Sequence, residues 1–310
     1  MRRDDVHRNG PTFAAALGLA AFLAAGGTFA QGDAQYTTEV HARKPSPTWT
    51  QDRNFSTTRV WLLDPGTLEV ATWSDTRIYE DGPASARFRE ELEIGIVPHL
   101  QLDLYAHFRY DPVDGARKPD GAVDASRRFQ WYGYSVEARV AIPDHYGQIP
   151  LNPVVYLEWI GQPDAPGRVE ARLLLGGAAA RWLFLAANPY VEFNVQPTKA
   201  DVPDGAGGTT RADVWVYDAE AGTTLAAGFG VTEWLRLSLE TKIGADMLGD
   251  ANNDWHFVWW IGPGLIVKPF NDKYLKIVGT FLFDLPVTDD DADHDAPQRY
   301  EPVVIVSSEF

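Results

Sequence analysis

Cysteine is absent from this sequence, which excludes a disulfide framework, a thiolate zinc site and a cysteine nucleophile. Basic residues are scarce: 27 Lys+Arg stand against 43 Asp+Glu among 310 residues, for a formal net charge of −16. Nucleic acids and anionic lipid leaflets both bind to basic faces, so the sequence argues against either partner. Walker A, GxGxxG, HExxH and GxSxG motifs are also missing, so we expect neither a bound cofactor nor a catalytic residue.

Long apolar runs are missing too, except near the N-terminus, where Phe13–Ala25 is apolar or small throughout. Three arginines precede this run, and Thr28-Phe29-Ala30 follows it with small residues where a signal peptidase requires them. The pattern predicts a secretory signal peptide over residues 1–30, cleaved near Ala30. A short buried N-terminal helix is the alternative. Beyond Ala30 no apolar run approaches the ~18 residues of a membrane helix.

Strict alternation of apolar and polar residues is the clearest feature that is present. Leu100–Tyr110 reads LQLDLYAHFRY and alternates over its whole length, which is about that of a tilted membrane strand. Leu235–Ala245 alternates in the same way. The hairpin pattern of Gly95–Leu104 recurs in Gly230–Leu239, where a strand, a tight turn and a returning strand follow one another. These patterns predict antiparallel pairing between neighbouring strands.

We therefore predict an all-β fold, an antiparallel up-and-down transmembrane β-barrel of about 12 strands, with an uncertainty of about two. Very short turns alternate with long, polar connections at 111–126, 196–210, 247–254 and 286–298, as in bacterial outer-membrane barrels. Tyrosines and tryptophans concentrate near the strand ends, where lipid headgroups would lie. A soluble sandwich or soluble barrel is the alternative. The candidate strands are Thr67–Tyr79, Ala86–Val97, His99–Tyr110, Arg127–Ala141, Pro150–Ile160, Gly167–Gly176, Arg181–Val195, Arg211–Val231, Glu233–Asp246, Trp255–Lys268, Asp272–Asp284 and Arg299–Phe310.

Two segments fit this scheme poorly. The connection Ile142–Asn152 is long although it falls on the short-turn side. Glu90 shares a face with Phe88 and Leu92, which would place a carboxylate on the lipid side. Either a β-bulge or a shifted register would account for Glu90.

Residues 31–65 are polar and precede the barrel, which we expect to occupy residues 66–310. Lys44-Pro45-Ser46-Pro47 interrupts any regular structure in this segment. Three interpretations remain open: a periplasmic tail, a plug inserted into the barrel, or an additional strand pair around Thr57–Leu63.

Three passages give the chain a resemblance to a family of Gram-negative outer-membrane β-barrel proteins, similar to the outer-membrane transporters associated with phenol degradation through the MetA pathway. These passages are Leu63–Val70, the hairpins Gly95–Leu104 and Gly230–Leu239, and the segment from Gly262 through Phe283. The resemblance covers most of the chain after Ala30 and implies a barrel architecture. It also implies that the terminal aromatic Phe310 is read by the barrel-assembly machinery, although Ser308 stands where such ends carry a second aromatic. It assigns no catalytic residue.

If Leu100 and the other apolar residues at alternate strand positions face lipid, the residues between them face the lumen. Charges there are tolerated when water or an opposite charge solvates them. Two states fit: charge ladders that shut the lumen, or charged walls around a narrow water-filled pore. The candidate lumen-lining residues are Arg87, Arg89, Glu91, Glu93, Asp103, His107, Arg109, Glu137, Arg139, Glu158, Glu170, Arg172, Glu192, Arg236, Glu240 and Lys242.

Two clusters suggest chemistry beyond passage. An acidic loop is dense in the oxygen ligands that Ca²⁺ or Mg²⁺ prefers, and a bound cation there would bridge to lipopolysaccharide phosphates. A solvated, self-repelling loop is the alternative. His107 with Asp103 and Arg109 forms either a small acid–base cluster or a lumenal hydrogen-bond network. The acidic loop residues are Asp289, Asp290, Asp291, Asp293 and Asp295.

The sequence thus predicts an exported protein of the Gram-negative outer membrane, and passage of small molecules is its expected function. The expected partners are outer-membrane lipid, lipopolysaccharide and the barrel-assembly machinery. No solute is identified by the residues. A closed structural or adhesion barrel and an enzyme acting on lipid remain the alternatives.

Overall fold

The structure is a computed structural model that describes residues 50, 52–57, 61–79, 84–110, 129–162, 166–195, 197–203, 205, 208–215, 219–247, 255–269, 275–285 and 298–310. The predicted signal peptide lies outside these residues. Among the described residues, no helix has the length and hydropathy needed to cross a membrane.

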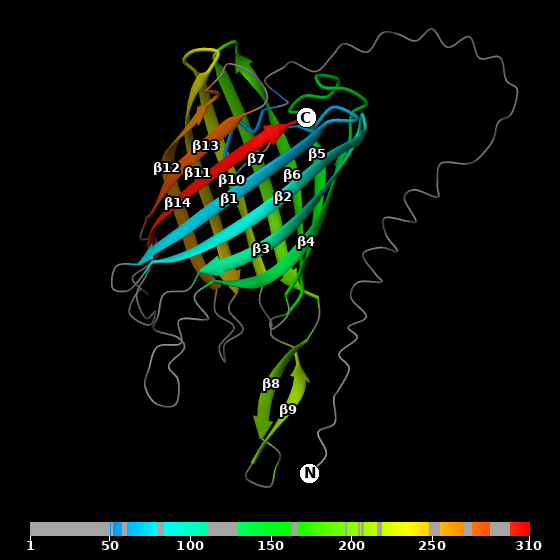
Figure 1. Cartoon of the computed structure of the whole chain (residues 1–310), viewed down its shortest axis with the longest axis vertical. Coiled ribbons are helices and arrows are strands. Elements are labelled where there is room, and N and C mark those ends of the chain that lie inside the picture. The colour runs from blue at the N-terminus through cyan, green and yellow to red at the C-terminus, as the bar shows by residue number, and fades with distance from the viewer. Residues whose placement is uncertain are drawn as a thin grey trace, which may run out of the picture. The chain divides into compact units, whose positions relative to one another are not determined.

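Twelve antiparallel strands close into one barrel, in the order β1-β14-β13-β12-β11-β10-β7-β6-β5-β4-β3-β2 (Figure 1). This confirms the predicted fold class and strand number. The strands are β1 Leu68–Tyr79, β2 Ser85–Val97, β3 Leu100–Tyr110, β4 Phe129–Ala141, β5 Val154–Gly161, β6 Arg168–Ala180, β7 Leu183–Asn194, β10 Ala219–Gly230, β11 Leu235–Met247, β12 Trp255–Val267, β13 Lys276–Asp284 and β14 Gln298–Glu309.

A separate hairpin, β8 Thr198–Pro203 and β9 Thr209–Val214, lies between β7 and β10 in the chain. The sequence prediction was wrong here, because it made residues 196–210 a loop and Arg211–Val231 one strand. The hairpin pairs with itself, and Gly205 in its turn has a positive φ of 75°. Gly and Pro are common turn residues, but period-two alternation alone does not show that a strand leaves the barrel wall.

The outer face of the barrel is apolar. Alternate strand residues such as Leu104, Leu157 and Leu239 expose 46%, 52% and 48% of their surface, although they are aliphatic. Aromatic residues near the strand ends are exposed in the same way, including Trp131 and Tyr300. A continuous apolar exterior of this kind is costly in water and stable in lipid.

Glu90 is exposed on this outer face and accepts a hydrogen bond of 2.8 Å from the Thr72 hydroxyl. The β1–β2 pairing is regular through Thr72 and Glu90, and the irregularity between β2 and β3 falls at Gly95/Val97. Neither the bulge nor the register shift considered for Glu90 is therefore present there.

The long connection 142–153 is an ordered loop between β4 and β5. Leu151 and Asn152 both have positive φ values, of 63° and 45°. The Asn152 side chain donates to the Gly176 carbonyl at 2.9 Å and accepts from the Gly147 amide at 2.5 Å. Tyr146 from this loop packs edge-on against Trp61, with ring centroids 5.5 Å apart. The extra length thus packs against β6 and against Trp61, which precedes β1.

Candidate functional site

The strand register brings acidic residues into a single row around the inner wall. From β14 round the wall to β10, nine acidic residues stand directly opposite one another from strand to strand. Like charges in cross-strand pairs are destabilising, so this row requires cations beside it. In the order of the paired strands around the barrel, the row is Glu309, Glu69, Glu93, Asp103, Glu137, Glu158, Glu170, Glu192 and Glu220.

On β4 to β11, cations of the wall itself neutralise the row. Arg139 lies 3.0 Å from Asp103 and also contacts Glu137. Arg172 pairs with Glu170 in the same way. Two further pairs continue round the wall: Arg168–Glu192 at 2.5 Å and Lys242–Glu220 at 2.7 Å.

Tyrosines alternate with these cations and form a stack along the wall. Arg139 and Arg172 lie 5.7 Å and 5.2 Å from the ring of Tyr156. The ring of Tyr190 lies 5.3 Å from Arg172 and 5.6 Å from Lys242. Because cation–π contacts hold the cationic side chains in place, this part of the lumen has a fixed charge pattern.

On β1, β2 and β13 the row is neutralised differently. Lys276 is fully buried and lies 3.0 Å from Glu309 and 3.4 Å from Glu69. The other cation is Arg53, which belongs to the segment before the barrel rather than to a strand. Its guanidinium is 3.9 Å from Glu69, 2.7 Å from Glu91 and in contact with Glu93.

The segment that carries Arg53 crosses the lumen. Asp52, next to it, turns to the other wall and lies 2.9 Å from Arg236 and 2.5 Å from Lys268. Burial lowers the pKa of Lys268, and the facing Asp52 carboxylate partly offsets that effect. Adjacent residues of opposite charge therefore tie this segment to β1 and β2 through Arg53, and to β11, β13 and the end of β12 through Asp52.

Residues 55–63 continue these contacts. Phe55 is 1% exposed and packs with Phe184, Ala186 and Ala226 of β7 and β10. The side chains and amides of Ser56 and Thr57 donate to the Glu240 carboxylate. Residues 52–57 and 61–63, which we call the lumen segment, thus contact strands all round the barrel. Whether residues 31–65 as a whole serve as a periplasmic tail, a plug or an additional strand pair stays a prediction.

The far end of the lumen segment is fixed against β3 to β6. Trp61 and Leu62 pack with Ala141, Val154, Tyr156 and Leu174 in a buried apolar cluster. The amide of Leu63 donates to the Gln101 side chain at 2.8 Å. After this bond the chain turns at Gly66 and begins β1.

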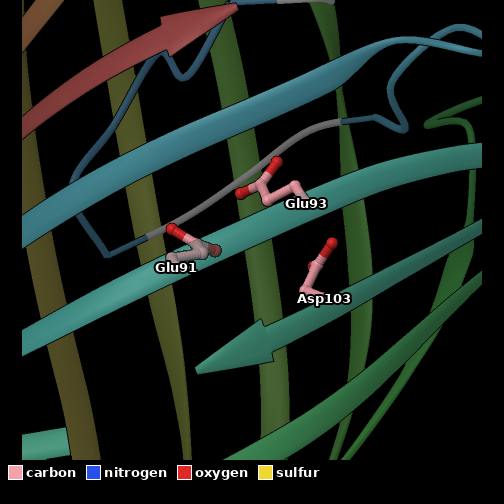
Figure 2. Close-up of side chains that lie close together, drawn as sticks. All are labelled: Glu91, Glu93 and Asp103. Atoms are coloured by element: carbon pink, nitrogen blue, oxygen red, sulfur yellow. The ribbon is translucent and has the colours of Figure 1, made fainter. Parts of the chain in front are cut away.

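Three carboxylates of β2 and β3 lie close enough to one another to hold a metal ion: Glu91, Glu93 and Asp103, with oxygens within 4.8 Å (Figure 2). Figure 2 shows them on neighbouring strands of one wall. Arg53 and Arg139 already bond to these carboxylates, so guanidinium groups supply the positive charge that a metal ion would bring. The geometry does not favour a metal ion while the lumen segment is bound.

His107 contacts Ser135 and Tyr105, and its part in an acid–base cluster or a lumenal hydrogen-bond network with Asp103 and Arg109 stays a prediction. Its Nε2 lies 2.9 Å from the hydroxyl of Ser135, and its ring stacks on Tyr105. Asp103 bonds to Arg139, and Arg109 lies over the ring of Tyr132. Ser135 could not be predicted as a partner of His107 from the sequence, because it belongs to the neighbouring strand and its spacing from His107 in the chain carries no signal.

The predicted lumen-lining residues occupy inward strand positions, and their part in lining a passage stays a prediction. Glu240 accepts bonds from the lumen segment, and Arg236 pairs with Asp52. Sequence reasoning missed Asp52, Arg53 and Lys276, because a lone polar pair outside any strand and a lysine at a strand start carry no distinctive pattern. The acidic loop Asp289, Asp290, Asp291, Asp293 and Asp295 lies outside the described residues.

Comparison with protein-family models and with curated protein sequences finds no match. Among solved structures, the chain is similar to the COG4313 outer-membrane channel from Pseudomonas putida F1, at 9% identity and a TM-score of 0.54. The match covers 81% of this chain and 98% of that one. A second similar structure is the NanC porin, at 9% identity and a TM-score of 0.48, covering 78% of this chain and 98% of that one. At such low identity the first match shows a shared fold: this chain has the fold of an outer-membrane β-barrel.

Proposed function

We propose that this protein is an outer-membrane channel for small solutes, narrowed by its own lumen segment. One observation carries the proposal: the exterior of the barrel is apolar, whereas the interior is lined by charged and aromatic side chains. A barrel of this size with a polar interior suits water and solutes rather than a packed core. The similarity in fold to the Pseudomonas putida F1 channel supports the same function.

The finer predictions from the sequence belong to this proposal. Export through a cleaved signal peptide, insertion in the outer membrane with Phe310 as an assembly signal, and contact with lipopolysaccharide are its expected setting. The resemblance to the MetA-pathway transporters concerns the architecture of the barrel and identifies no solute. A cation bound by the loop around Asp289 would lie at the outer rim of the barrel.

Single-channel conductance in a planar bilayer tests the proposal, with protein purified from outer membranes. Heat-modifiable migration on a gel serves as the folding control. We expect conducting steps, small or intermittent in the wild-type protein because the lumen segment occupies part of the cross-section. A folded barrel that never conducts, even after variants that loosen the lumen segment, would refute the channel and favour a closed structural barrel.

An enzyme is the second candidate, from the single contact between His107 and Ser135. A hydroxyl beside an imidazole is the start of a nucleophilic site. Ser135 is only 1% exposed, however, so a lipid substrate would not reach its hydroxyl. We expect no phospholipid hydrolysis by the folded barrel, and hydrolysis that disappears in Ser135→Ala would reverse this conclusion.

A further inference from the structure

Four arginines gather on the inner wall of β1 to β3, next to the Trp73 ring that Arg53 of the lumen segment also contacts. Arg77 is on β1, Arg87 and Arg89 are on β2, and Arg109 is on β3. The register sets Arg87 directly opposite Arg109 on one side and Asp75 on the other. Positive charges in cross-strand contact repel one another, so this arrangement has a free-energy cost that something must offset.

Arg139, Arg168, Arg172, Lys242 and Lys276 have carboxylate partners, as described above. Arg77, Arg87 and Arg89 differ: within the described part of the chain, no carboxylate oxygen lies within 4.0 Å of their nitrogens. The buried Nε of Arg77 and the Oδ1 of Asp75 also lack hydrogen-bond partners. A buried donor such as this Nε and a buried acceptor such as this Oδ1 are normally hydrogen-bonded in folded proteins.

Aromatic rings hold these arginines in place. The guanidinium of Arg89 lies 4.2 Å from the ring of Trp73. Those of Arg87 and Arg109 lie 6.0 Å and 5.2 Å from the ring of Tyr132. Tyr132 sits at an irregularity in the β3–β4 pairing, between the partners of His107 and Phe108. A bulge redirects a side chain, and here it puts the ring beside both arginines.

We propose that this cluster, the arginine site, binds small oxyanions and favours molecules with two or three carboxylates. The planar guanidinium groups of Arg87 and Arg89, which lie against aromatic rings, match the two oxygens of a carboxylate. Asp75 limits the net charge, and Arg87 is solvent-exposed, so an anion approaching the arginine site would meet it first. The inference gives the proposed channel its solute class and rests on that function for its biological meaning, but binding is measurable without conduction.

Isothermal titration of the detergent-solubilised barrel with citrate tests the arginine site, with inorganic phosphate as a second titrant. The variant pair is R87Q/R89Q against R168Q, because Arg168 is also an inward cation but is paired with Glu192. We expect citrate to bind the wild type more tightly than phosphate. R87Q/R89Q should weaken citrate binding by about tenfold or more, since each arginine contributes a charge-assisted hydrogen bond. R168Q should bind as the wild type does.

Several results would overturn the inference. One is that the folded wild type does not bind citrate. Another is that R87Q/R89Q binds citrate as tightly as the wild type does. A third is that R168Q loses as much citrate affinity as R87Q/R89Q, which would mean that citrate is attracted by the positive charge of the lumen in general. If phosphate binds more tightly than citrate, the arginine site favours phosphate and the inference of a carboxylate ligand is wrong. If R87Q/R89Q fails to show heat-modifiable migration, R89K, which keeps the charge but loses the planar group, takes its place. Citrate binding without conductance would support the arginine site and refute the channel. Conductance without citrate binding would support the channel and refute the arginine site.

Discussion

Arg53 offers the sharpest test of whether the lumen segment is bound inside the barrel. Its guanidinium is 3% exposed and bonds to Glu91 and Glu93. Hydrogen bonds to charged groups contribute about 1.5–3 kcal/mol each, so Arg53→Met should weaken binding of the segment by about 3–6 kcal/mol. Water that enters to solvate the glutamates reduces this loss, which makes the figure an upper bound.

Labelling of an introduced cysteine measures this change directly, because the natural chain has no cysteine. Ser56 is 4% exposed, so Ser56→Cys should react slowly with a maleimide while the lumen segment is bound. A loss of about 3 kcal/mol raises the unbound fraction by about 10²-fold, and the labelling rate in R53M/S56C should rise accordingly. R168M/S56C is the control, since Arg168 does not touch the segment. Equal labelling rates in S56C and R53M/S56C would refute the idea that Arg53 holds the segment.

Three further substitutions test the packing of the barrel. Gly95→Ala should lower the temperature at which heat-modifiable migration is lost, because a Cβ there would lie 2.2 Å from the Asp64 carbonyl oxygen. Gly279→Ala is the control and should leave this temperature unchanged, because a Cβ there meets nothing closer than 3.9 Å. Lys276→Met removes the nearest cation from two buried glutamates and should cost about 3–5 kcal/mol in urea unfolding; Lys276→Arg should recover part of it. Phe310→Ala keeps both backbone bonds to Leu68, so it should refold in detergent yet accumulate less in the outer-membrane fraction; normal accumulation would remove Phe310 as an assembly signal.

The strands could be predicted from the sequence because a barrel wall separates two environments at every second residue. Leu100–Tyr110 was predicted and found as β3 because its apolar and polar faces differ throughout. The same alternation says nothing about which strand a segment pairs with. That is why β8 and β9 were not separated from β10.

The inward side chains could be predicted, but their mutual positions could not. Parity places Glu93, Asp103 and Glu137 on one face, whereas the register that sets them directly opposite one another depends on the geometry of each turn. The bulge beside Tyr132 shows the same limit, because a single extra residue changes which side chains meet. Arg53 lies in no strand at all, so parity does not apply to it.

The row of acidic residues gives the lumen segment a structural reason to be there. From β4 to β11 the wall carries its own arginines and lysine, whereas on β2 the cation that bonds to Glu91 and Glu93 is Arg53 of the lumen segment. If that charge balance is what keeps the segment bound, removing the acids should remove the need for Arg53. In a double-mutant cycle with E91Q/E93Q, Arg53→Met should then add little to the labelling rate of S56C, because the two changes act on one interaction. Additive effects of the two changes would mean that Phe55, Trp61 and Asp52 hold the segment independently of this charge pair.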